Sequence, residues 1–584
     1  MSAHVRIKFL LIAALACSWQ CSTSAAQTNA IRFAAEVPRA PEEMQVFKLT
    51  PSRPPLVFLN EKLRQAKLTP LKTEGKAFMA REASSRNERD RVRAFVDPQS
   101  GDSQLTPNFA DLVRSGAPHT PLAGERAASI AASALNDERF IPRDATKLRV
   151  ADGITVMAGT TPRAQKPGVK AIEPRSILTI VPAVRYAAGF RVYGQGSHAV
   201  ISIANNGVVV GALRRWRTAS EAERVPTIIT SEQARESIER QLRPMTLAEG
   251  TKATVDKIDI AYYDANANYL QPVYRFEATI TPANERVSPI KVAGYVPLAK
   301  ELEPIPDLSR KPEGPAPRMP KQDSRQNGAG TPDDISLGEY ANQDWPNDSG
   351  YVSMSNSFLR GLTFLNGFFP GITPPVNRTQ WYVAYPWEVV GPSSKYFMNA
   401  VNVAYTVPHG DWLINTTKSN NADFWDVRDI GTGGNPGYGA AAGGVLATWV
   451  IMSCEVIPSM YDRQNESGGS GNPYTAFDAW WPVFQGLHNA IGFRTIMFYP
   501  DDDLQFGFGL DASVGGDLNG AWFQEVAAYD GDDGTYASQH LTGKIPVHYD
   551  RASTMIDARD LGQSIYNVRP QSASSTLWNF WMGN

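Results

Sequence analysis

The pattern of apolar and polar positions changes character along this 584-residue chain. In the first half, short β-branched runs separated by Gly and Asn turns lie at 177–181, 187–193, 199–203 and 208–213. Runs of this length with such turns predict antiparallel hairpins. Before them, Ala, Ile and Leu recur at helical spacing over 121–135. We therefore expect an α+β module over residues 116–225.

The same order of a helix followed by strands recurs over residues 226–302. Ser231 is a good N-cap for a helix that reaches Leu242. Strand-like runs follow at 255–263, 272–280 and 292–297. The helix start Ser231-Glu232-Gln233-Ala234 and the strand Pro272-Val273-Tyr274-Arg275-Phe276 resemble propeptide modules of the PepSY type. An unrelated α+β domain is the alternative.

Three further segments differ in composition. Residues 27–115 mix polar runs with prolines, and 81–93 is densely charged, which predicts an extended or loosely ordered arm. Residues 303–337 are Pro-rich with few large apolar side chains, which predicts a linker. From 338 to 584, apolar runs of strand and helix character alternate. That alternation predicts an α/β domain with a mainly parallel sheet.

Charge is divided unevenly between the two halves. From Tyr340 onward, the chain has 11 Lys and Arg against 23 Asp and Glu, a net of −12, and the remainder has 46 against 36, a net of +10. Opposite net charges favour contact between the halves. We therefore expect the N-terminal half to be an intramolecular pro-region, and no nucleic acid to be the partner. Alternatively, the two domains simply differ in composition.

The first 26 residues have the pattern of an export signal. Arg6 and Lys8 precede a short apolar run, and the small residues Ser24-Ala25-Ala26 offer a cleavage site. The run is too short to span a bilayer, so we expect a secreted or periplasmic protein with no transmembrane anchor. Removing the signal removes Cys17 and Cys21, which leaves Cys454 as the one cysteine. A single thiol in an oxidising compartment is either inert and buried or kept for its reactivity.

Two apolar blocks of the C-terminal half end in residues capable of chemistry. The block 400–408 leads into His409-Gly410-Asp411, and the block 446–452 leads into Ser453-Cys454-Glu455. Ligands of open α/β sheets bind beyond the carboxyl ends of the strands, so both side chains would face one crevice if the strands are neighbours. An imidazole there can take the proton of a thiol, and the resulting thiolate attacks carbonyl carbons.

A strand that ends in His-Gly and a later strand that ends in Ser-Cys resemble the motifs of the caspase-like cysteine peptidases, over about residues 400–500. That group includes caspases, legumains, gingipains, clostripain and separase. The resemblance implies an α/β/α sandwich with His409 as general acid/base and Cys454 as nucleophile. It also implies an oxyanion hole made by the backbone N–H groups of Gly410 and Cys454. Some members select basic side chains with a pocket carboxylate, for which Asp411 and Asp462 are candidates.

Other residues are weaker candidates for chemistry. Three other histidines are weaker candidates than His409 for the partner of Cys454, namely His488, His540 and His548. Glu455 would oppose thiolate formation if it pointed inward, and we expect it to point away. No zinc-peptidase, serine-hydrolase or phosphate-loop motif occurs, and no cofactor is required. Acidic runs at 501–503 and 530–534 leave a structural calcium ion possible.

The sequence thus predicts a secreted cysteine endopeptidase made as a zymogen, which cleaves protein or peptide substrates through a thioester intermediate. Residues 27–302 would cover the site until the linker is cut. The alternative is a non-catalytic binding or surface module on the same scaffold. Adjacent strands carrying His409 and Cys454 would favour the enzyme, whereas a thiol buried away from any cleft would favour the module.

Overall fold

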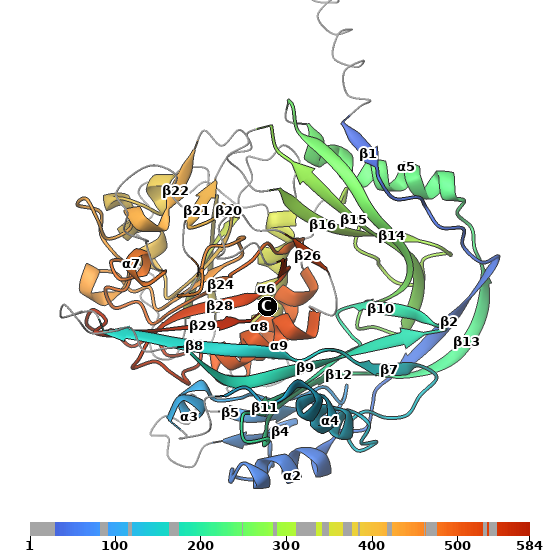
Figure 1. The fold of residues 1–584 in the computed structure, drawn as a ribbon, viewed down its shortest axis with the longest axis horizontal. Helices are drawn as coiled ribbons and strands as arrows, with labels where there is room; N and C mark the ends of the chain where they lie inside the picture. The colour runs from blue at the N-terminus through green and yellow to red at the C-terminus, as the bar shows by residue number, and fades with distance from the viewer. Residues whose placement is uncertain are drawn as a thin grey trace, which may run out of the picture.

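The computed structural model describes most of the chain in sixteen stretches (Figure 1). These are residues 30–81, 92–114, 120–162, 174–247, 249–283, 289–310, 335–341, 350–365, 376–382, 386–416, 423–460, 462, 476–500, 502–529, 534–536 and 546–583. Helices and strands alternate in a mixed α/β architecture, which confirms the coarse prediction of fold class. The N-terminal half supplies two mainly antiparallel sheets, and the C-terminal half supplies a mainly parallel one.

The first antiparallel sheet of the N-terminal half is called the wall. Its strands are β3 (Lys72–Glu74), β4 (Ala77–Arg81), β5 (Val92–Val96), β6 (Ser103–Leu105), β7 (Lys147–Val150), β8 (Ile154–Pro162), β9 (Arg175–Ala187), β11 (His198–Ala204) and β12 (Val209–Arg215). Helices α2 (Leu56–Gln65), α3 (Phe109–Arg114) and α4 (Gly124–Leu135) belong to it. The order of its main strands is β8–β9–β11–β12–β6–β5–β4–β3.

The second sheet of the N-terminal half is called the cover. Its strands are β1 (Ile31–Phe33), β2 (Glu43–Thr50), β13 (Thr218–Pro226), β14 (Lys252–Asp264), β15 (Tyr269–Thr281) and β16 (Ile290–Pro297). Helix α5 (Ser231–Leu242) belongs to it and is followed by the 3-10 turn η2 (Arg243–Thr246). Strand β10 (Phe190–Gly194) pairs with both β9 and β14 and so links the cover to the wall.

The parallel sheet lies in the C-terminal half. Its order is β18 (Val376–Tyr382), β17 (Ile335–Ala341), β19 (Val403–Val407), β23 (Thr448–Ile451) and β24 (Asn489–Phe493), all parallel. Two antiparallel strands, β28 (Ala552–Asp557) and β29 (Thr576–Met582), continue it. Strand β29 then pairs with β8, so the C-terminal sheet runs on into the wall without a break.

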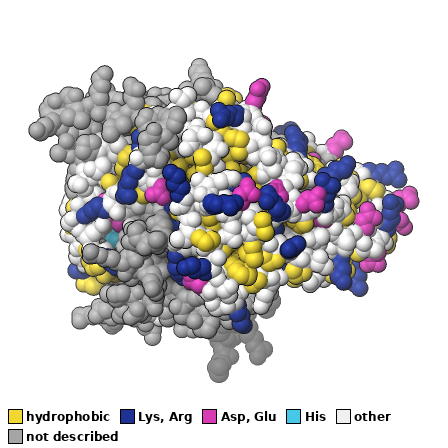
Figure 2. Space-filling model, turned by 90° about the horizontal axis from the view of Figure 1, so that it is seen from below, with side chains coloured by type: hydrophobic (Ala, Val, Ile, Leu, Met, Phe, Trp, Pro, Cys, Tyr) yellow, Lys and Arg dark blue, Asp and Glu magenta, His cyan; other side chains and the backbone are white. Residues whose placement is uncertain are grey.

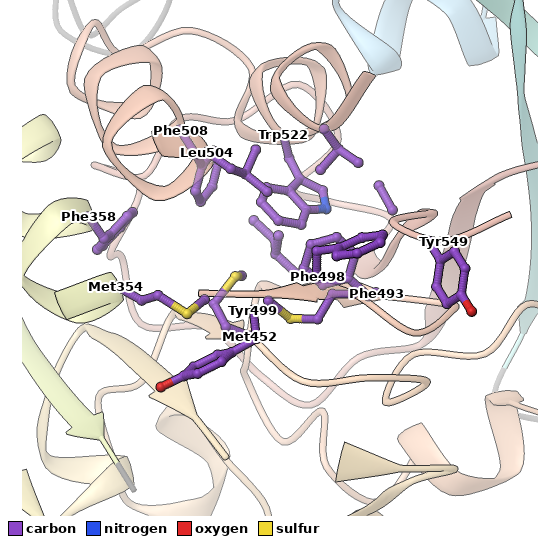
Figure 3. Close-up of a cluster of buried hydrophobic side chains, with 14 of the residues drawn as sticks. Met354, Phe358, Met452, Phe493, Phe498, Tyr499, Leu504, Phe508, Trp522 and Tyr549 are labelled. Carbon is purple, nitrogen blue, oxygen red and sulfur yellow. The ribbon is translucent and has the colours of Figure 1, made fainter. Parts of the chain in front are cut away.

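Apolar side chains alternate between the two faces of the parallel sheet. Helices α6 (Gly350–Phe364), α8 (Asp502–Ser513) and α9 (Leu518–Tyr529) pack on one face. Figure 3 shows Phe358 and Phe508 from these helices on the same side as Phe493 of β24 and Met452, which directly follows β23. The opposite face packs against loops and the short helix α7 (Ala476–Trp480) through a tryptophan cluster around Trp449.

Short elements connect these layers. The C-terminal half also contains β20 (His409–Asp411), β21 (Ile414–Thr416), β22 (Phe424–Asp426), β25 (Phe498–Tyr499), β26 (Thr535–Tyr536) and β27 (Val547–His548). Its 3-10 turns are η4 (Pro386–Glu388), η5 (Pro392–Tyr396), η6 (Met398–Ala400), η7 (Val427–Asp429) and η8 (Ala440–Ala442). Helix α7 ends at Trp480, and β24 and β25 are separated by residues 494–497.

Several sequence predictions need correction in the N-terminal half. Residues 30–81 and 92–114 are not a loose arm, because they form β1–β6, α2 and α3. Helix α2 buries an apolar face made by Phe58, Leu59 and Leu63. The polar residues around this segment had led to the prediction of a loose arm. The two predicted modules also interleave, since β13 pairs with β2 and β1 pairs with β14. The N-cap of α5 is Thr230, which forms a capping box with Gln233.

The predicted linker is described only in part. Residues 303–310 follow the cover, 311–334 lie outside the described residues, and β17 begins at Ile335, inside the predicted 303–337 boundary. One buried ion cluster joins the basic half to the acidic half: Arg215 of the wall contacts Asp511 and Glu525 of the C-terminal half. On the face drawn in Figure 2, basic and acidic side chains are intermixed.

Candidate active site

The two predicted motifs follow neighbouring parallel strands. Strands β19 and β23 pair from Val403 opposite Thr448 to Thr406 opposite Ile451. Pro408 separates β19 from β20, which begins at His409, and Cys454 follows the end of β23 in a turn. Both motifs therefore lie at the same edge of the sheet, as a site beyond the carboxyl ends of strands requires.

Gly410 brings the two motifs into contact. A Cβ atom built on Gly410 would overlap Ser453 Oγ and would lie 2.8 Å from the carbonyl oxygen of Cys454. Only glycine leaves room for this approach, because every other residue has a Cβ. The His-Gly sequence is thus packed directly against the Ser-Cys sequence, although the motifs are 45 residues apart in the chain.

Asn415 joins the two motifs by a hydrogen bond. It lies opposite Gly410 in the β20–β21 hairpin and is fully buried. The hydroxyl of Ser453 donates to its Oδ1 at 2.6 Å, whereas its Nδ2 has no hydrogen-bond partner among the residues that the structure describes. Sequence reasoning missed this residue, because an Asn in a short strand carries no local signal of its contacts. The signal became readable only once the hairpin register was known.

His409 is buried at the start of the same hairpin. It is 3% exposed, and its backbone oxygen accepts a hydrogen bond of 3.2 Å from Thr416 Oγ1. Its position beside the turn that carries Cys454 follows from the contact between Gly410 and Ser453. The roles of His409 and of the Gly410 and Cys454 backbone N–H groups remain predictions.

The thiol of Cys454 is held in its protonated form. It is 5% exposed, and burial raises its pKa to about 12, to which the carboxylates of Glu455, Asp550 and Asp411 add. The backbone N–H of Met497 donates to the sulfur and opposes this shift. A thiol in this state is a poor nucleophile at neutral pH.

The expectation that Glu455 points away from the site is wrong, because its side chain is directed into the protein. It is 2% exposed and has a φ of 49°, a left-handed conformation that is uncommon for residues other than glycine. Its Oε1 accepts a hydrogen bond of 2.7 Å from Tyr536 Oη. Its charge therefore acts on Cys454 from inside the fold.

The cover reaches the chain segment beside the thiol. Strand β16 pairs with β25 in parallel, with Lys291 opposite Phe498 and Val292 opposite Tyr499. Phe498 directly follows Met497, the residue whose N–H contacts the sulfur of Cys454. A cavity of about 100 Å³ lies where the wall, the cover and the C-terminal half meet, and Cys454 does not line it.

The two candidate pocket carboxylates have different environments. Asp462 is fully buried, and both of its oxygens accept hydrogen bonds from Arg494, at 2.6 and 2.9 Å. It therefore braces the loop after Cys454 and is not available to a substrate, so this prediction needs correction. Asp411 ends β20 and acts electrostatically on Cys454, so its place near the thiol is retained.

The remaining candidates lie elsewhere or cannot be assigned. His488 lies before β24 with its Nδ1 3.5 Å from Asp560, and burial lowers its pKa. His548 is part of β27, and His540 lies outside the described residues. Asp501 and residues 530–533 of the acidic runs also lie outside them. Within the described ranges, no cluster of three or more His, Cys, Asp or Glu side chains is arranged to hold a metal ion.

Comparison with known proteins adds little to this geometry. No family model and no curated protein matches the chain. A solved structure of an uncharacterised protein from Eubacterium rectale matches with 9% identity and a TM-score of 0.28, over 47% of this chain and 90% of its own. A likeness at that level carries no argument about function. Among the helices that the structure describes, none has the length and apolar character to cross a membrane.

Proposed function

We propose that the chain is a secreted cysteine endopeptidase of the caspase-like type, made as a zymogen. His409 would be the general acid/base and Cys454 the nucleophile. The observation that carries the proposal is the packing of Gly410 against Ser453 and Cys454 at the carboxyl ends of adjacent parallel strands. Ligand sites of open α/β sheets lie at this edge, and the packing brings together two motifs that are distant in sequence.

The proposed reaction uses the two side chains in sequence. His409 takes the proton of the Cys454 thiol, and the resulting thiolate attacks the carbonyl carbon of a peptide bond. The oxygen takes the negative charge beside the N–H groups of Gly410 and Cys454. His409 gives a proton to the departing amine, which leaves a thioester on Cys454. His409 then takes a proton from water, which hydrolyses the thioester and restores the thiol.

The buried thiol fits the latent form of such an enzyme. Its raised pKa arises first from burial, and the β16–β25 pairing of the cover lies next to its hydrogen-bond donor Met497. Displacing the cover would admit water and substrate to this edge, which would return the pKa toward its ordinary range. Latency is therefore proposed to depend on the cover.

The same burial supports a second candidate function. A thiol with a pKa near 12 inside an apolar cluster is also what an inert structural cysteine looks like. On that reading, the chain would be a non-catalytic binding module, and Gly410 would be required for packing alone. The adjacent strands favour the enzyme, whereas a buried thiol that lines none of the described cavities favours the module. Peptide hydrolysis must therefore decide between the two.

The test is peptide hydrolysis by the full chain after limited proteolysis of the linker. We expect wild-type protein to cleave casein or a mixed fluorogenic peptide library, and Cys454→Ala and His409→Ala to abolish cleavage. His548→Ala is the matched control and should retain activity. Undiminished cleavage by Cys454→Ala, or no cleavage by any processed form, would rule out the peptidase and leave the binding module.

A further inference from the structure

The wall and the C-terminal half are joined by a long strand pairing. Strand β29 pairs with β8 over seven residues, from Thr576 opposite Pro162 to Met582 opposite Val156. Thr160 adds a side-chain hydrogen bond of 2.8 Å to the backbone oxygen of Leu577. Because β28 occupies the other side of β29, removing β8 would expose a row of unpaired backbone groups in the middle of one sheet.

A buried ion cluster crosses the same interface. Arg215 of β12 is 2% exposed and lies 2.7 Å from Asp511 of α8 and 2.5 Å from Glu525 of α9. Burial disfavours the charge of Arg215, but the two carboxylates raise its pKa well above the ordinary value, so it stays charged. Removing one partner while the surfaces stay together would leave a buried charge unpaired, which is strongly unfavourable, so the cluster fixes how the two surfaces fit together.

Apolar and polar contacts surround the ion cluster. Phe109 stacks on Phe523 and meets Phe580 edge-on, with ring centroids 5.4 and 4.9 Å apart. The backbone N–H of Phe109 donates to Asp517 at 2.6 Å. Gln524 donates from α9 to the backbone oxygen of Leu105 at 3.2 Å. Residues of the wall and of α8, α9 and β29 therefore share one core.

From these contacts we infer that the wall is a permanent subunit of the C-terminal half. Cutting the chain between 311 and 334 produces a two-chain particle and releases neither fragment. The N-terminal half is thus not a pro-region that departs whole. This inference does not depend on the proposed peptidase activity.

The experiment uses the full chain with a site-specific protease sequence inserted between residues 311 and 334. After cleavage, the two fragments are expected to elute together from a sizing column as a 1:1 particle, in 0.15 M and in 1 M salt. In a urea titration, fragment separation and loss of tryptophan fluorescence should coincide. Elution of two separate folded fragments, or separation at urea concentrations that leave the fluorescence intact, would overturn the inference.

A substitution at the interface locates the association. In the cleaved protein, Arg215→Met should raise the dissociation constant between the fragments roughly 100-fold or more, because it strands Asp511 and Glu525. The matched control Arg240→Met breaks an exposed pair, 3.4 Å from Asp307, and should change the constant less than about threefold. Equal effects of the two substitutions would overturn the assignment of the interface. If Arg215→Met does not fold, the urea titration of the cleaved wild-type protein remains the test of the inference.

Discussion

The wall and the cover come from the same N-terminal half, yet they meet the C-terminal half in different ways. Among the described residues, the wall pairs with it over seven residues of β8 and β29, whereas the cover pairs over two residues of β16 and β25. The wall contact also buries an Arg with two carboxylates. We therefore expect the wall contact to be the stronger of the two.

The wall contact should show the largest effect of a single substitution. Phe109→Ala removes a fully buried ring that contacts Phe523 and Phe580 of the C-terminal half. We expect a loss of about 3–5 kcal/mol in the free energy of unfolding, measured by urea titration. A matched apolar substitution at the exposed Val57 should cost less than about 0.5 kcal/mol. A loss of under 1 kcal/mol for Phe109→Ala would show that the wall is loosely attached.

The cover should control the reactivity of the thiol. Because the pKa of Cys454 rises from 9.0 to about 12, its thiolate fraction at pH 8 is roughly 1000-fold lower than that of an ordinary cysteine. Alkylation by iodoacetamide should be slowed by about this factor in the intact protein. Val292→Asp places a charge in the β16–β25 contact and should restore much of the rate.

A substitution in the wall is the control for this labelling experiment. Thr161→Ala lies in β8 and should leave the alkylation rate of Cys454 unchanged. Fast labelling of the wild-type protein, or slow labelling of Val292→Asp while the cover is open to protease, would contradict the role of the cover.

The contact between the cover and α8 should weaken as the pH rises. Burial raises the pKa of Asp503 to about 7, with Asp502 adding to the shift, and Tyr263 of β14 donates to both Asp503 oxygens at 3.2 Å. A carboxyl with a raised pKa stabilises the fold fully below its unfolded value of 3.8, and this stability is lost as the pH rises toward 7.

The measurement is proteolysis of the cover between pH 4.5 and 8. Since Asp503 keeps some contact with solvent, we expect a change of about 1–2 kcal/mol in its opening free energy over this range. Asp503→Asn should flatten the profile, whereas Asp259→Asn, at an exposed position of β14, should not. A flat wild-type profile would exclude this pH dependence.

The smallest effect on stability is expected at Asn415. Asn415→Ala removes the acceptor of Ser453 together with a buried amide that has no partner, so the net change should stay within about 1 kcal/mol. If the proposed function holds, peptide hydrolysis should nevertheless fall about tenfold, because the turn before Cys454 loses its support. Thr416→Val, which removes the neighbouring bond to the His409 backbone, is the control. Equal losses of stability and activity would indicate a purely structural residue.

The features that could be predicted from the sequence are those set by local patterns of residues. The hairpins of β9–β12 and β14–β16 and the helix ending at Leu242 were readable from β-branched runs, turn residues and a capping sequence. The positions of His409 and Cys454 after parallel strands followed from two apolar blocks. These features depend on residues close together in the chain.

The remaining features depend on contacts between distant residues. The burial of Cys454 is set by segments around Met497 and Asp550, and the engagement of Asp462 by Arg494, more than 30 residues away. The strands within residues 30–114 are ordered by pairing with β12, β13 and β14, which lie more than 100 residues later in the chain. No local pattern records such partners.

The join between β8 and β29 has a consequence for how the protein reaches its native state. Thr160 and Leu577, which are hydrogen-bonded there, are 417 positions apart. Contacts of such long range form slowly, because the entropy of closing the loop is lost before the contacts are gained. Until β29 arrives, β8 presents an open edge to any other extended chain, so the yield of refolding should depend steeply on protein concentration.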